Sequence, residues 1–158
     1  MRALIQRVNR AHVSIQGKVV GSIAHGLVLF LGIGLHDTTQ DASYLVQRLL
    51  NLRIFSDGEG KFDRSSIEVA ASLLVISQFT LYADTRKGRR PSFMGAASSA
   101  EAEILFDQTV ELLRQENVTV VTGKFGAHMK VDLQNDGPVT IWIDSAERLR
   151  PRRTPKDN

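Results

Sequence analysis

Leu27-Val28-Leu29-Phe30-Leu31 places five apolar side chains on consecutive positions, and this stretch decides the fold. Successive side chains of a β-strand point to opposite faces of the sheet, so a strand that is apolar throughout must be covered on both faces. We therefore expect residues 27–31 to form a central strand with packed layers on either side.

Shorter strands are expected around this one. Apolar residues recur over residues 3–15, and a turn at Gly17-Lys18 leads into Val19-Val20. Residues 51–55 look extended, and residues 56–60 have the composition of a turn. Further along the chain, apolar and β-branched residues predict strands over residues 72–80, 118–122, 129–134 and 139–144.

Two helices are expected between the strands. Thr38 and Asp41 have the spacing of a capping box, and the apolar residues that follow predict a helix over residues 39–51. Ser98 and Glu101 repeat that spacing before a second helix that extends to about residue 116. A long polar loop over residues 84–98 precedes it.

The order of these elements predicts an α+β fold, with a mixed, mainly antiparallel sheet and two main helices. A chain of 158 residues with 42% hydrophobic and 23% charged residues is long and apolar enough for one globular domain. No internal repeat suggests a second unit.

The net charge of +3 comes from the end of the chain. Residues 146–158 hold five basic and two acidic side chains, so residues 1–145 carry 15 of each sign. We expect a single domain over residues 1–145 and a basic, flexible tail over residues 146–158, without assigning the tail a partner.

Several kinds of chemistry are absent from the sequence. There is no cysteine, the four histidines are scattered, and neither a nucleophile elbow nor a phosphate loop is present. We therefore expect no metal and no cofactor. The start of the chain has no apolar signal core, and the most apolar stretch, residues 26–35, is about half a membrane span, so we expect a cytoplasmic protein without membrane contact.

Two segments stand out chemically. In Ser77-Gln78-Phe79-Thr80-Leu81-Tyr82, an apolar strand ends in hydroxyls and an amide, which either form the floor of a polar pocket or cap the strand end. Asn135-Asp136-Gly137-Pro138-Val139-Thr140 is either an ordinary hairpin turn or holds a cis Gly-Pro bond whose flanking carbonyls bind an ammonium group. The sequence does not choose between these alternatives.

A basic loop lies between the two segments. It holds four cations within five residues, namely Arg86, Lys87, Arg89 and Arg90. Such a run is usually solvated surface, but its place directly after the hydroxyl-rich strand end suits it to hold a nucleic-acid phosphate beside a reaction site.

These segments, in this order, resemble the D-aminoacyl-tRNA deacylases, also called D-tyrosyl-tRNA deacylases. The similarity starts at Met1-Arg2-Ala3 and Gln6-Arg7-Val8, continues through residues 51–55 and 77–93, and ends at residues 135–140. It implies a barrel-like core, a homodimer, and hydrolysis of the ester that joins a D-amino acid to the 3′ end of tRNA. Glycyl-tRNA should also be a substrate, while DNA should not be a partner.

The resemblance also implies roles for individual residues. Substrate-binding residues would be Ser77, Gln78, Phe125, Met129, Gly137 and Pro138, with the Gly137-Pro138 bond cis and inserted into the partner subunit's site to exclude L-amino acids. Thr80 and Phe79 would act in catalysis, including as backbone oxyanion donors, and Arg7 would brace the Gly-Pro turn. Arg86, Lys87, Arg89 and Arg90 would contact tRNA phosphates.

Two questions of chemistry stay open at this point. The hydrolysis can be carried by Thr80 or by the neighbouring ribose 2′-hydroxyl of the tRNA, and we favour the RNA-assisted route because an aminoacyl ester is already activated. The alternatives to a deacylase are a non-catalytic RNA-binding module and a hydrolase of small free esters on the same fold.

Overall fold

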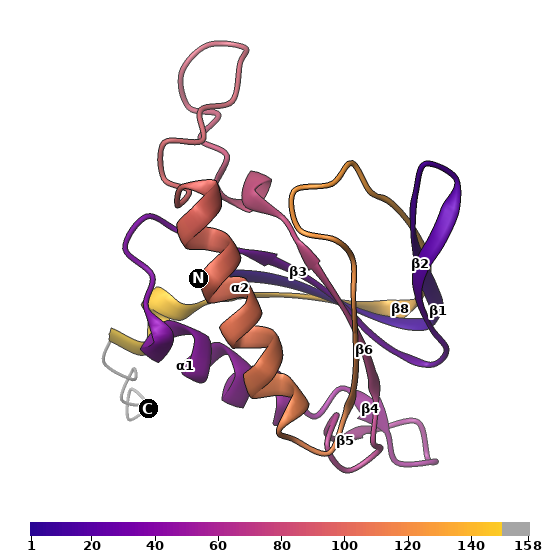
Figure 1. Ribbon diagram of the computed structural model, residues 1–158. Helices are drawn as coiled ribbons and strands as arrows, with labels where there is room; N and C mark the ends of the chain where they lie inside the picture. Colours follow the sequence, from indigo (N-terminus) through magenta and orange to yellow (C-terminus); the bar gives the residue numbers. More distant parts are fainter. Residues whose placement is uncertain (150–158) are drawn as a thin grey trace.

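The computed structural model describes residues 1–149 (Figure 1). The elements in chain order are β1 (Arg2–Ile15), β2 (Lys18–Ile23), β3 (Gly26–Gly32), α1 (Thr39–Leu50), β4 (Phe55–Ser56), β5 (Phe62–Arg64), β6 (Ser72–Ser77), η1 (Phe79–Tyr82), α2 (Ser99–Arg114), β7 (Thr119–Thr122), β8 (Lys130–Asp144) and η2 (Ser145–Leu149). Both predicted helices are confirmed, each ending within two residues of its expected bounds.

The main sheet is mixed and has β3 at its centre. Its strand order is β2-β1-β3-β6-β7, and β8 pairs with the other edge of β1. The β1, β2, β3 and β8 pairings are antiparallel, whereas β3–β6 and β6–β7 are parallel. The sheet curls so that β2 lies close to β7. A Cβ built on Gly21 of β2 would lie only 2.7 Å from Val121 Cγ1 of β7. The predicted α+β class with a barrel-like core is confirmed.

The central strand is buried on both faces, as predicted. Leu27, Leu29 and Leu31 point to a large core that includes the inner faces of α1 and α2. Val28 and Phe30 point the other way, into a smaller core inside the curled sheet with Leu74 and Ile76. Both helices lie on the same side of the sheet (Figure 1). The end of the curled sheet at which β6 terminates is therefore available for a site.

Three predictions of local structure are wrong. The first turn lies at Gln16-Gly17, one residue earlier than expected. The strand predicted over residues 72–80 ends at Ser77, because the chain turns into η1. Residues 129–134 and 139–144 are not two strands joined by a turn but parts of the single strand β8.

β8 stays continuous because it pairs with β1 on both sides of residues 136–139. Between the pairs Gln6–Thr140 and Val8–Asn135, the four residues 136–139 lie opposite Arg7 alone. The Asp-Gly-Pro signal that usually marks a turn here marks a bulge, where the missing proline N–H costs no ladder hydrogen bond. The Gly137-Pro138 peptide bond within it is cis.

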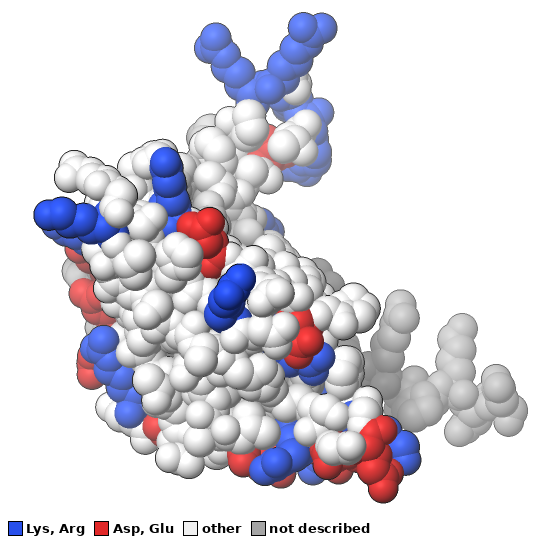
Figure 2. Space-filling model, turned by 90° about the vertical axis from the view of Figure 1, so that its right-hand side faces the viewer, with Lys and Arg blue, Asp and Glu red and all other residues white. Residues whose placement is uncertain are grey.

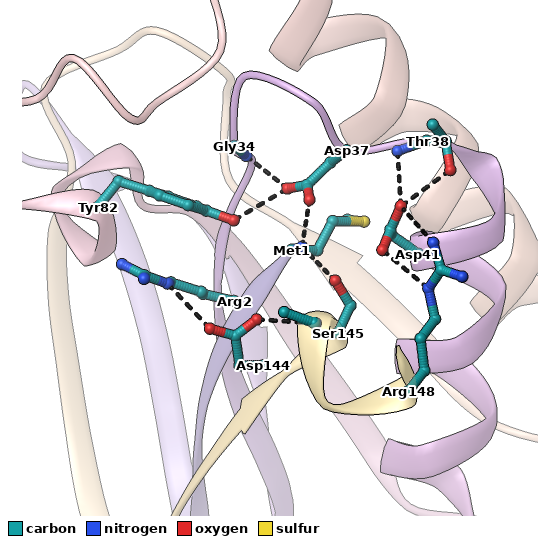
Figure 3. A network of polar contacts seen from close by, with 11 residues as sticks. Met1, Arg2, Gly34, Asp37, Thr38, Asp41, Tyr82, Asp144, Ser145 and Arg148 are labelled. Atoms are coloured by element: carbon teal, nitrogen blue, oxygen red, sulfur yellow. Dashed lines mark hydrogen bonds and ion pairs between the residues drawn. The ribbon is translucent and has the colours of Figure 1, made fainter. Parts of the chain in front are cut away.

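The two ends of the described chain meet in a polar network beside α1 (Figure 3). The Met1 ammonium group is buried and pairs with Asp37 Oδ1 at 2.5 Å and with the Ser145 hydroxyl. Asp37 Oδ2 also accepts a hydrogen bond of 3.0 Å from the Tyr82 hydroxyl. This network ties the first strand, the entry to α1 and η1 together.

The fold extends past the predicted domain boundary at residue 145. Residues 146–149 belong to η2, and Arg148 Nε lies 3.1 Å from Asp41 Oδ1 at the start of α1. The rest of the predicted tail lies outside the described residues. None of the helices within residues 1–149 is long and apolar enough to cross a membrane.

Gly26→Ala should destabilise the protein strongly. A Cβ at Gly26 would lie 1.9 Å from the Ser72 carbonyl oxygen, so β3 and β6 would have to move apart. We expect a loss of about 3 kcal/mol or more in the free energy of unfolding, measured by denaturant titration. Gly95→Ala is the matched control, because its nearest neighbour atom would be 3.6 Å away. Equal effects of the two substitutions would contradict the close approach.

Asp41→Asn should cost stability in a pH-dependent way. Burial alone would raise the pKa of the Asp41 carboxyl, but hydrogen bonds from Arg148 and Thr38 outweigh it and hold the pKa well below its usual range. The carboxylate therefore stabilises the fold fully above the unfolded pKa of about 4 and loses this effect as the pH falls below it. We expect the variant to lose about 1–2 kcal/mol near neutral pH, a gap that narrows in acid. A gap independent of pH would contradict this.

Candidate functional site

A cavity of about 560 Å³ opens where β6 ends. Its walls come from the end of β3, the β6–η1 junction, the start of α2 and the segment 125–129. The lining residues are Leu31, Ile33, Ile76, Ser77, Gln78, Phe79, Phe93, Ala96, Ala97, Ser99, Ala102, Phe125, Gly126, Ala127, His128, Met129 and Val131. Its volume is that of a site for a small organic group or nucleoside.

Sheet pairing fixes the polar floor of the cavity. Ser77 is in register with Leu31 on β3, and the Gln78 N–H donates to the Leu31 carbonyl at 2.8 Å. The chain then turns into η1, whose first hydrogen bond runs from the Leu81 N–H to the Gln78 carbonyl at 3.2 Å. The amides of Phe79 and Thr80 come before that bond, so the turn does not use them as donors.

The other walls are held by short backbone contacts. The Ala97 N–H donates to the Ile33 carbonyl at 3.0 Å, which docks the start of α2 beside β3. The Gly123 N–H donates to the Val75 carbonyl at 3.3 Å, which anchors the segment that carries Phe125 and Met129. These two walls are therefore attached by backbone hydrogen bonds to the sheet that forms the floor.

The cavity is mostly apolar and partly aromatic. Phe79 and Phe93 meet edge to face, with ring centroids 5.0 Å apart, and Phe79 is 58% exposed. Phe125 packs against Phe106 of α2 at 5.7 Å. Such surfaces suit a flat ring system, with Ser77 and Gln78 as the polar groups that orient it.

The structure brings together five of the residues predicted for the site: Ser77, Gln78, Phe79, Phe125 and Met129. Thr80 does not line the cavity. Its side chain is exposed next to it, and its Oγ1 accepts a hydrogen bond from Gln78 Nε2. Thr80 is thus one contact away from the cavity in this chain.

Gly137 and Pro138 also lie outside the cavity, exposed on the bulge of β8. Arg7 supports this bulge from below: its guanidinium is buried, and Nε lies 2.8 Å from Asp136 Oδ2. The same guanidinium donates to the Ile54 carbonyl and lies 5.0 Å from the centre of the Phe62 ring. The Gly-Pro step is therefore presented outward on a fixed support.

The basic loop projects beyond the cavity, at the top of the molecule in Figure 2. Its base is closed by paired backbone hydrogen bonds between Asp84 and Ser92, of 2.8 and 2.9 Å. Arg86 donates two hydrogen bonds to the Asp84 carboxylate, from Nε at 2.9 Å and from Nη2 at 2.7 Å. These hydrogen bonds lower the pKa of Asp84 to about 2. Arg86 is therefore neutralised locally, whereas Lys87, Arg89 and Arg90 make no ion pair within residues 1–149.

Some lining residues were not found from the sequence. Phe93 and the small residues Ala96 and Ala97 lie in the predicted loop, where no periodicity marks them. His128 stands between the predicted residues Phe125 and Met129, so adjacency was the available signal. Within residues 1–149, no group of three His, Asp or Glu side chains is arranged to hold a metal ion.

Comparison with known proteins gives one consistent result. The family model described as D-Tyr-tRNA(Tyr) deacylase matches residues 4–144. D-aminoacyl-tRNA deacylases of Dehalococcoides mccartyi (strain 195) and Chloroflexus aurantiacus are each 55% identical over 153 residues, which is 97% of this chain and 100% and 96% of those proteins.

Solved structures share the fold of this chain. One described as "c-Myc DNA Unwinding Element Binding Protein" is 39% identical, with a TM-score of 0.87 over 91% of this chain and 98% of its own. One of a probable eukaryotic D-amino acid tRNA deacylase, 18% identical, shares the fold with a TM-score of 0.78 over 90% and 97% of the two chains. A family match over nearly all of the described residues and identity above one half leave one conclusion: the chain belongs to the D-aminoacyl-tRNA deacylase family.

Proposed function

We propose that this protein hydrolyses the ester bond of D-aminoacyl-tRNA and releases free tRNA and the D-amino acid. The observation that carries the proposal is the cavity at the end of β6, which is lined by Ser77, Gln78 and Phe79 and is followed by a turn that does not use the Phe79 and Thr80 amides as donors. The relatives that share about half of the sequence carry the same activity in their names.

The cavity suits the aminoacyl-adenosine end of tRNA. A volume of about 560 Å³ accommodates a nucleoside with its ester, and the aromatic rings of Phe79, Phe93 and Phe125 offer faces and edges for the base. The Gln78 side chain can orient a ribose or ester oxygen by hydrogen bonding. The larger part of the tRNA then stays outside, where the basic loop projects.

The chemistry proposed needs orientation more than a strong base. Water attacks the ester carbonyl carbon, and the negative charge that develops on the carbonyl oxygen is stabilised by the amides of Phe79 and Thr80. The bond between the carbonyl carbon and the ribose 3′-oxygen breaks, and the 3′-oxygen takes up the proton that the attacking water gives up. The adjacent ribose 2′-hydroxyl assists the attacking water, so that Thr80, whose hydroxyl already accepts from Gln78, is not the nucleophile.

Chirality is proposed to come from a second copy of the chain. Gly137 and Pro138 lie outside the cavity of their own chain, yet they are exposed on a bulge that Arg7 supports. In a homodimer this step would enter the partner's cavity, where its carbonyls would hold the substrate's α-amino group and its bulk would fill the space of an L side chain. Glycine has no side chain to exclude, so glycyl-tRNA would also be hydrolysed.

The basic loop is proposed to hold tRNA phosphates. Lys87, Arg89 and Arg90 extend into solvent without acidic partners in the described part of the chain, so their charges are free for this role. Arg86 was predicted to share it, but its bidentate pair with Asp84 makes it a support of the loop first. We therefore assign the larger share of phosphate contact to the other three.

Two alternative functions predict different experimental results. A non-catalytic nucleic-acid-binding module would bind without turnover, and one structural relative is described by DNA binding. A hydrolase of small free esters would not need the basic loop, so its rate would not depend on salt. Turnover of a tRNA ester, with strong salt dependence, would exclude both.

The purified protein should hydrolyse D-tyrosyl-tRNA and glycyl-tRNA at least about 100-fold faster than L-tyrosyl-tRNA, because exclusion of an L side chain by a rigid group costs several kcal/mol. The measurement is loss of the radiolabelled ester with time at limiting enzyme. Comparable rates on both tyrosyl enantiomers would contradict chiral exclusion, and no loss of any of the three esters would remove the proposed function.

Thr80→Ala should lower the rate on D-tyrosyl-tRNA by less than about tenfold, since the amide donors remain and only one hydrogen bond is lost. The comparison is made in single-turnover reactions, with Ser99→Ala as a control that alters a different hydroxyl of the cavity lining. Collapse of the Thr80→Ala rate to background would make Thr80 essential to the chemistry.

A further inference from the structure

A second hollow lies on the far side of the segment that walls the cavity. It has a volume of about 590 Å³ and is lined by Ile15, Gln16, Gly17, Lys124, Ala127, His128 and Lys130. We call it the lysine pocket. It sits between the β1–β2 turn and residues 124–130.

The lysine pocket is adjacent to the cavity. Ala127 and His128 line both, so a chain that leaves the cavity over this segment would pass next to the lysine pocket. The segment is a tight turn, closed by a hydrogen bond of 3.2 Å from the Ala127 N–H to the Lys124 carbonyl. Lys124 begins this turn, and Lys130 lies three residues after its end, at the start of β8.

No carboxylate within residues 1–149 forms an ion pair with the lysines of the lysine pocket. None of its lining residues is acidic, and neither Lys124 nor Lys130 makes an ion pair with any residue between 1 and 149. Asp132 lies two residues along β8 from Lys130, outside the pocket lining, and its Oδ2 is 3.3 Å from His12 Nε2. Two free ammonium groups over a hollow favour a ligand with negative charge.

The groove on the opposite side of the same segment is lined by acidic residues. The groove between α2 and residues 122–125 is lined by Glu103, Asp107 and Glu111, against Arg114 and Lys124. Arg114 is already bound to Glu111 at 2.5 Å. A polyanion leaving the cavity over α2 would meet carboxylates, so charge directs it across the lysine pocket instead.

We propose that the lysine pocket binds the backbone phosphates of the single-stranded 3′ segment of tRNA, next to the terminal adenosine in the cavity. This assignment rests on the proposed function for the identity of the substrate. Lys124 and Lys130 supply the contacts, and the basic loop is left for phosphates elsewhere on the tRNA. The site is thus separate from the groups that act on the ester.

The test is the double variant Lys124→Gln/Lys130→Gln, with uncharged tRNA as the binding probe. Each phosphate contact on a single strand contributes about −0.7 to the slope of log affinity against log salt concentration, so the slope should fall by about 1.4. The ratio of wild-type to variant affinity should accordingly shrink about sevenfold between about 50 and about 200 mM salt. The control is Arg48→Gln/Lys61→Gln, which removes two cations that line neither the cavity nor the lysine pocket.

A second readout separates phosphate binding from an effect on the cavity. The variant should raise KM for D-tyrosyl-tRNA with kcat unchanged, and it should hydrolyse D-tyrosyl-adenosine, which has no phosphate, at the wild-type rate. An unchanged salt slope, or equal losses on both substrates, would overturn the assignment. If the wild-type protein hydrolysed neither ester, the proposed function would fail, while the salt slope would still decide whether the lysines bind RNA.

Discussion

The hydrogen bonding along β1 is the constraint on which the rest of the structure depends. This strand pairs with β3 over its first half, with β2 over its second half, and with β8 over both. β3 in turn holds β6, whose last residues form the floor of the cavity. β8 begins directly after Met129 and carries the Gly137-Pro138 bulge near its middle, and the residues on both sides of the bulge are registered against β1. The parts of the site are therefore fixed relative to one another by one ladder.

Charge acts locally in this molecule. The net charge of +3 predicts little, because acidic and basic residues balance over residues 1–145. What matters is which cations have a carboxylate partner. Arg7, Arg86 and Arg148 are bound to carboxylates and stabilise the fold. The unpaired cations of the basic loop and the lysine pocket lie to either side of an apolar cavity. A substrate with a polyanionic body and one neutral end fits this distribution.

Much of this architecture could be predicted from the sequence, where local patterns agree with tertiary packing. The Leu27–Leu31 run predicted the central strand, and the two capping boxes predicted α1 and α2. The prediction failed at residues 136–139 because the same residue types form bulges and hairpin turns, and only the pairing of the flanking residues with Gln6 and Val8 of β1 decides between them. It also missed His128 and Phe93, which reach the cavity through loop paths that no periodicity encodes. The ion pair between Arg86 and Asp84 could not be predicted, because two residues that are close in sequence need not point their side chains toward each other.

The central claim is that each site is built from two copies of the chain, and cysteine cross-linking tests it most directly. The natural sequence has no cysteine, so Pro138→Cys and Ala127→Cys can be introduced without background. The account predicts a disulfide between chains when both changes are present, seen as a covalent dimer under non-reducing conditions, and none with either change alone. A double variant that stays uncross-linked under oxidation while its light scattering shows a dimer would contradict the claim.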